Sequence, residues 1–213
     1  MMKRTQWIII VSITLLLLWM VTTFEIFDFH TNLSNNIRPQ VEGEIVDTIK
    51  RTTLLVFKKE QRVELWTTDK HHQNHLIISE KIILSNNKNG TRLYDNETII
   101  PEGIYEIQAV DSVNLSFTIN FPNDFDKEKQ KADKRPALNS IITFGIEKND
   151  LQLTKEFMIK FLDYAEIAAV ANTNILIVPY DFNKHQFNQT CLTCPFWIEE
   201  LYGSLRVYQK EFE

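Results

Sequence analysis

The stretch Pro101-Glu-Gly-Ile-Tyr-Glu-Ile107 decides how the middle of this chain folds. Proline restricts one backbone angle and glycine permits the next, so a turn leads into the alternating residues Ile-Tyr-Glu-Ile, which predict a strand. A second alternating run, Asn114–Phe121, predicts another strand and is stopped by Pro122-Asn-Asp124. Segment 126–135 interleaves both charge signs and is interpreted as a solvated loop. The apolar run Ile141–Gly145 closes a block rich in β-structure.

The residues before this block predict further strands. Two strand-like runs, Thr53–Phe57 and Arg62–Trp66, are separated by four polar residues, which indicates a hairpin. His75–Ser79 and Lys81–Ser85 predict another strand or a bent pair, and 91–100 is expected to form the loop that leads to Pro101.

The residues after the block predict helices on either side of one strand. Thr154 is a suitable N-cap for a helix whose apolar residues recur at three- and four-residue spacing. Ile175–Pro179 predicts a short buried strand, and a closing helix is expected around 196–201. Together these patterns predict a mainly β (α+β) domain over residues 49–213 with peripheral helices.

Composition limits the classes of function. The chain has 213 residues, 44% of them hydrophobic, which is enough for one core of ordinary size. Its net charge is −5, from 28 acidic and 23 basic residues, and the basic residues are scattered. This distribution argues against nucleic-acid binding. The sequence also lacks the common glycine-rich phosphate loops.

Residues 1–24 are predicted to be a cytoplasmic tip and a transmembrane signal-anchor. Residues 7–24 carry no charge and as a helix would span about 27 Å, enough to cross a bilayer. Lys3 and Arg4 precede them, which favours a cytoplasmic N-terminus and a C-terminal domain on the outer side. The alternative is a cleaved signal peptide, although no small-residue cleavage site follows. Residues 25–48 are interpreted as a tether.

The order of several short motifs resembles the L,D-transpeptidase (YkuD-type) catalytic domain, most closely its murein-hydrolase-like branch. The motifs are Asp95, Pro101-Glu-Gly-x-Tyr105, Leu115-Ser116, Phe121-Pro-Asn123 with Asp126, and a strand that ends at Gly145. The resemblance covers roughly residues 50–212 and implies a curved β-sheet or sandwich with helices packed outside. It also implies a bacterial source and a groove for a peptidoglycan stem peptide. The groove residues carried over are Pro101, Glu102, Gly103, Tyr105, Ser116, Asn123, Asp126, Phe144 and Gly145.

The chain departs from this family at the two catalytic positions. The family's histidine position falls on Phe144 and its cysteine nucleophile position falls on Asp150, while 146–154 contains neither residue type. The family reaction is acyl transfer through a thiolate, with histidine moving the proton. A phenyl ring accepts no proton, and a carboxylate is a poor nucleophile towards an amide. We therefore expect a domain without catalysis and without a cofactor.

Two other clusters invite a chemical interpretation. His71, His72 and His75 have a spacing that a metal ion could share, but the same spacing suits the solvated tip of a hairpin, and no metal site is predicted. Cys191 and Cys194 form a Cys-x-x-Cys motif before the closing helix. In an oxidising compartment this motif indicates a small structural disulfide, and the alternative is a redox-active pair.

Three functions remain open at this point. The leading hypothesis is an envelope protein of the bacterial cytoplasmic (inner) membrane, anchored in the bilayer through residues 7–24, with a catalytically inactive domain that binds peptidoglycan peptide or an envelope protein. The second is an active L,D-transpeptidase or murein peptidase in peptidoglycan remodelling. The third is a thiol-disulfide protein that uses Cys191 and Cys194.

Overall fold

The computed structural model describes residues 49–86, 90–147, 150–169, 172–184 and 197–212. The predicted anchor (1–24), the predicted tether (25–48) and the Cys191/Cys194 motif lie outside these ranges. Within them, no helix has the length and apolar character needed to cross a membrane.

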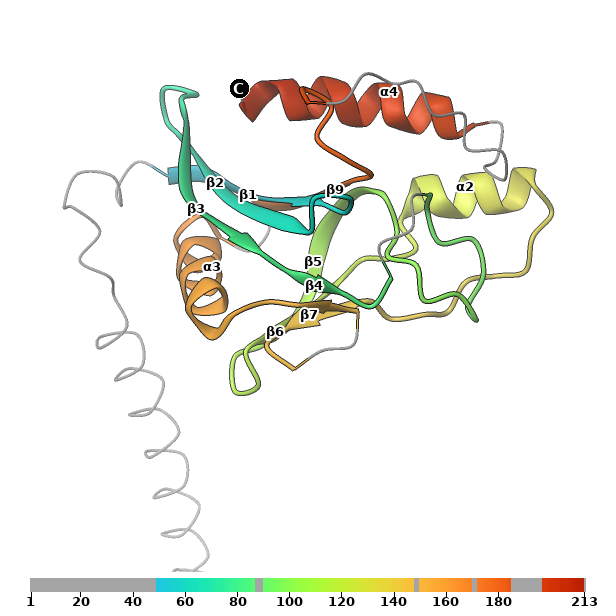
Figure 1. The fold of residues 1–213 in the computed structure, drawn as a ribbon, viewed down its shortest axis with the longest axis horizontal. Helices are drawn as coiled ribbons and strands as arrows, with labels where there is room; N and C mark the ends of the chain where they lie inside the picture. The colour runs from blue at the N-terminus through green and yellow to red at the C-terminus, as the bar shows by residue number, and fades with distance from the viewer. Residues whose placement is uncertain (1–48, 87–89, 148–149, 170–171, 185–196, 213) are drawn as a thin grey trace, which may run out of the picture. The chain divides into compact units, whose positions relative to one another are not determined.

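Nine strands form one mixed sheet (Figure 1), in the order β3-β2-β1-β9-β5-β6-β7-β8-β4. β1 runs parallel to β9, and β7 runs parallel to β8, whereas the other neighbours are antiparallel. The strands are β1 (Ile49–Phe57), β2 (Arg62–Asp69), β3 (Asn74–Lys81), β4 (Ile83–Leu84), β5 (Gly103–Asp111), β6 (Ser116–Ile119), β7 (Thr143–Gly145), β8 (Leu151–Gln152) and β9 (Thr173–Val178).

The sheet curls into a nearly closed barrel, as the short connection between its two edge strands shows. β3 and β4 lie at opposite edges of the sheet, yet only Ile82 separates them in the chain. A flat sheet would hold these edges many strand widths apart, since neighbouring strands lie about 4.8 Å from one another. The predicted curved sheet is therefore confirmed. The strands belong to one continuous sheet, not to the two sheets of a sandwich.

Alternate residues of β1 belong to two different hydrophobic cores, as expected for a strand covered on both faces. Leu54 and Val56 join the first core, which includes the aromatic side chains of Phe117 and Phe161. Leu55 belongs to the second core, together with residues of α4 (Ile198–Gln209). Figure 1 shows α4 alongside β1 and β9, and α3 (Lys155–Ile167) on another side of the sheet.

Most elements predicted from the sequence are confirmed. β1 and β2 form the predicted hairpin, and β5, β6, β7 and β9 lie where alternating or apolar runs predicted strands. Thr154 is the N-cap of α3, since its Oγ1 accepts a hydrogen bond from the backbone N–H of Phe157 at 3.1 Å. A helix also closes the described chain, as predicted.

The prediction of a loop over 126–135 is wrong for most of that segment. Asp124–Ala132 forms α2, which begins with a capping box between Asn123 and Asp126. Each of these residues accepts a hydrogen bond from the other's backbone N–H, at 2.9 and 3.1 Å. The reciprocal cap satisfies two backbone donors that otherwise have no partner at a helix start. Lys129 then forms an ion pair with Glu200 of α4 at 2.7 Å.

Candidate functional site

A fully buried ion pair lies at the start of the Pro101–Tyr105 motif. The Nζ of Lys58 donates to Glu102 Oε1 at 2.9 Å, and both side chains are 0% exposed. The same ammonium donates to the carbonyl oxygens of Gly90 and Ile100, each at 2.9 Å. Its three donors are therefore all used. Burial lowers the pKa of Lys58, and the carboxylate of Glu102 opposes that shift.

Glu102 connects this ion pair to the last helix. Its Oε1 also accepts from the backbone N–H of Gly90 at 2.9 Å, and its Oε2 accepts from the hydroxyl of Tyr202 at 2.7 Å. Burial and the neighbouring carboxylate raise the pKa of Tyr202, so the hydroxyl keeps the proton that it donates. Of the predicted groove residues, Pro101, Glu102 and Gly103 are thus buried in the domain. Glu102 links Lys58, which directly follows β1, to Tyr202 of α4.

Tyr105, Asn123 and Asp126 come together at the start of α2. The hydroxyl of Tyr105 donates to Asp126 Oδ2 at 3.2 Å, and the side-chain amide of Asn123 donates to the carbonyl of Ile104 at 2.9 Å. Burial raises the pKa of Asp126 to about 6, although its hydrogen bonds with Asn123 and Tyr105 oppose the shift. A Cβ at Gly103 would lie 2.8 Å from the Tyr105 hydroxyl, so the close approach of this ring requires glycine.

Phe144 and Asp150, the positions to which the sequence resemblance assigned a catalytic pair, lie on β7 and just before β8. Phe144 is 0% exposed, and its ring packs edge-to-face against Phe117 with centroids 5.2 Å apart. The ring centroids of Phe117 and Phe161 lie 4.7 Å apart. Asp150 Oδ2 accepts a hydrogen bond from the backbone N–H of Thr143 at 3.0 Å. The phenyl ring of Phe144 has no group that exchanges a proton, and the Asp150 carboxylate is hydrogen-bonded to the backbone.

Ser116 and Gly145 face each other in neighbouring strands, β6 and β7. A Cβ at Gly145 would lie 2.6 Å from Ser116 Cβ and 2.8 Å from the carbonyl oxygen of Leu115. Such contacts are closer than real Cβ atoms show, so glycine permits this strand pairing.

A groove of about 640 Å³ lies over β5. Ile104, Glu106 and Gln108 of β5 line its base, because alternate side chains of a strand point to one face. Asn174 of β9 lies on one side, and the segment from Asn120 through the first turn of α2 lies on the other. Of the predicted groove residues, only Asn123 lines this cavity.

Sequence reasoning missed Glu106, Gln108, Asn120 and Asn174. The alternation Ile104, Glu106, Gln108 could have placed Glu106 and Gln108 on one face of the strand. For Asn174 of β9, the sequence contains no comparable pattern. Its proximity to Glu106 depends on the antiparallel pairing of β5 with β9.

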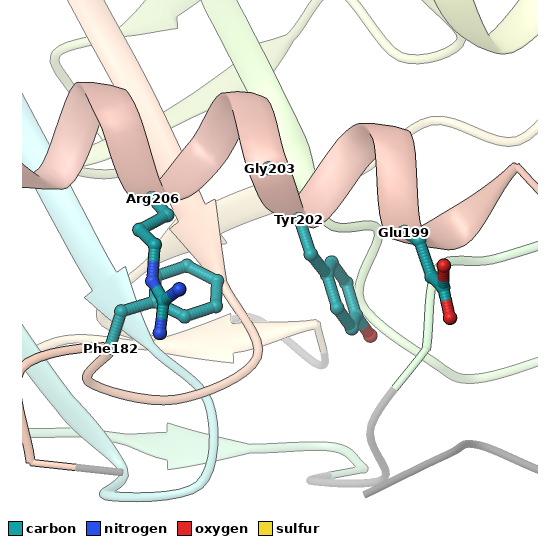
Figure 2. A pocket seen from close by; sticks show the side chains of 5 residues that line it. All are labelled: Phe182, Glu199, Tyr202, Gly203 and Arg206. Atoms are coloured by element: carbon teal, nitrogen blue, oxygen red, sulfur yellow. The ribbon is translucent and has the colours of Figure 1, made fainter. Parts of the chain in front are cut away.

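A second, smaller cavity of about 210 Å³ lies beside α4 (Figure 2). Phe182, Glu199, Tyr202, Gly203 and Arg206 line it, and the Arg206 guanidinium lies 5.9 Å from the centre of the Phe182 ring. Of its polar groups, the Tyr202 hydroxyl already donates to Glu102.

The histidine cluster lies at and beside a hairpin turn. His71 and His72 are exposed between β2 and β3, and His75 is in β3 with its Nε2 3.3 Å from Asp69 Oδ2. Asp69 Oδ1 accepts from the backbone N–H groups of His71 and Gln73 at 2.8 and 2.9 Å. The described residues contain no group of three potential metal ligands.

Comparisons with known proteins give only distant structural similarity. No protein-family model matches the chain, and no curated protein matches it either. Among solved structures, a mutant form of the helical cell shape determining protein Pgp2 from Campylobacter jejuni has a TM-score of 0.46 at 11% identity, over 65% of this chain and 52% of that chain. Another Pgp2 structure has a TM-score of 0.45 at 11% identity, over 70% and 55%.

Bd1075 from Bdellovibrio bacteriovorus has a TM-score of 0.41 at 16% identity, over 76% of this chain and 56% of that chain. This chain thus spans little more than half the length of each of these proteins. The similarity is one of fold, and it is distant.

Proposed function

We propose that this protein is a membrane-anchored component of a bacterial cell envelope whose L,D-transpeptidase-like domain binds peptide without catalysing acyl transfer. The ligand in this proposal is peptidoglycan peptide. The ordered motifs between Asp95 and Gly145 support the family assignment, and the uncharged residues 7–24 support a single-pass anchor in the cytoplasmic membrane with the domain on its outer side.

The burial of Phe144 is the observation that best supports a domain without catalysis. General acid-base catalysis needs a group that reaches the reacting atoms and exchanges a proton there. Phe144 has no such group, and its ring is enclosed by Phe117 and the first core. Asp150 holds the backbone N–H of Thr143, so its carboxylate supports the turn between β7 and β8.

The test measures turnover and binding on one sample. Full-length protein in detergent is incubated with purified tetrapeptide-bearing muropeptides, the products are identified by mass spectrometry, and binding is measured by calorimetry. Heat-denatured protein is the control for spontaneous hydrolysis. Saturable binding without product is expected, whereas new cross-links or released alanine would overturn the proposal. In that case, the variants Cys191→Ser and Cys194→Ser would show whether a thiol performs the reaction.

A further inference from the structure

The groove over β5 presents polar side chains to solvent, since Glu106 and Gln108 are exposed and Asn174 is half-buried. The carboxylate of Glu106 and the side-chain amides of Gln108 and Asn174 form no hydrogen bond with another described residue. The backbone N–H of Glu106 donates to Asn120 Oδ1 at 2.9 Å, which leaves the Asn120 amide nitrogen available on the other side. Carboxylate and amide groups along a groove suit a ligand with many hydrogen-bonding groups.

The spacing of these groups matches an extended peptide. Side chains two residues apart on one face of a strand are separated by about 6.6 Å, and an extended peptide repeats with the same spacing. The groove follows β5 from Ile104 to Gln108. This length is about 13 Å, which accommodates roughly four residues of an extended chain.

The charges in the groove favour a ligand with a positive group. Glu106 has no ion-pair partner among the described residues, whereas Asp124 lies 3.6 Å from the ammonium of Lys127. An ammonium group on the ligand would therefore gain most from a position beside Glu106.

We infer that this groove binds an extended peptide of about four residues, with its backbone on Gln108 and Asn174 and a side-chain ammonium on Glu106. This inference rests on the peptide-binding role proposed above and assigns that role to one place. The site lies over β5 and α2, and Phe144 is not among its lining residues.

The test measures fluorescence anisotropy of a labelled synthetic tetrapeptide with lysine at its third position. Full-length protein in detergent is titrated against this peptide and against the same peptide acetylated on the lysine Nε. The variants are Glu106→Gln, which removes the charge, and Asn174→Leu, which removes the amide. Glu199→Gln is the matched control, because it removes a carboxylate from the smaller cavity beside α4. Thermal unfolding of each variant verifies the fold.

The wild-type protein is expected to bind the lysine peptide saturably. Glu106→Gln and lysine acetylation should each weaken binding about fivefold, and combining them should add little, since both remove one ion pair. Asn174→Leu should weaken binding of both peptides alike, and Glu199→Gln should change neither. If Glu106→Gln and Asn174→Leu bind like wild type, the groove is not the site, although the proposed function stands. Binding to muropeptides but not to the synthetic peptide also overturns the inference alone. Binding to neither ligand overturns both proposals.

Discussion

Replacing Glu102 with glutamine should destabilise the folded domain by about 3–5 kcal/mol, the usual cost of removing one partner from a buried ion pair. Lys58 and Glu102 are both 0% exposed, so the remaining ammonium could not be solvated without opening the domain. For a domain of this size, the loss corresponds to a decrease of roughly 6–20 °C in the unfolding midpoint. Calorimetry and guanidinium titration of the purified protein measure it.

The pH dependence of this variant tests the cause of the destabilisation. Burial already lowers the pKa of Lys58, and removal of Glu102 should lower it further. A neutral lysine needs no counter-ion. The destabilisation caused by Glu102→Gln should therefore become smaller as the pH rises towards the ordinary pKa of lysine. A loss that is constant with pH would contradict this explanation.

Two further variants separate the charge from its hydrogen bonds. Lys58→Met combined with Glu102→Gln should recover most of the stability, because no charge is then buried and the amide oxygen can still accept from Gly90. Glu106→Gln, four residues further along, changes an exposed carboxylate and should alter stability by less than about 0.5 kcal/mol. A loss below about 1 kcal/mol for Glu102→Gln alone would refute the reasoning.

Three other substitutions test separate features of the fold. Gly203→Ala should stabilise the protein by about 0.5–1 kcal/mol in a denaturant titration, because the added Cβ meets open space in the middle of α4. Gly145→Ala should destabilise it by more than about 1 kcal/mol, measured in the same way, because the Cβ would clash with Leu115 and Ser116. The pKa of Asp126 is about 6, above its ordinary value of 3.8, so the folded chain binds this proton more tightly than the unfolded chain. Its contribution to the free energy of unfolding is therefore fully present below pH 3.8 and is lost as the pH rises through 6. Asp126→Asn should remove this pH-dependent contribution, which amounts to up to about 3 kcal/mol. Denaturant titrations of both proteins from pH 4 to 8 would then show that the free energy of unfolding changes less with pH in the variant.

The local elements were largely predictable because their signals lie within a few residues. Pro101 and Gly103 mark the entry to β5, and Thr154 caps α3. α2 was the exception, since its charged sequence resembles a solvated loop. The capping box of Asn123 and Asp126 was present in the sequence, but its importance depends on the Tyr105 hydroxyl, which donates to Asp126 from a different element.

The sequence by itself determined the strand segments around Pro101–Gly145, and it determined that neither histidine nor cysteine stands at the positions, Phe144 and Asp150, that the resemblance to L,D-transpeptidases assigns to catalysis. Only the tertiary structure decided that Glu102 is buried with Lys58, that Phe144 belongs to an aromatic cluster, and that Glu106 and Asn174 line one groove. The physical reason is that local patterns specify backbone conformation and the face of a strand, whereas these contacts join residues from strands far apart in the chain. They depend on the order and register of β1, β9 and β5 in the curled sheet.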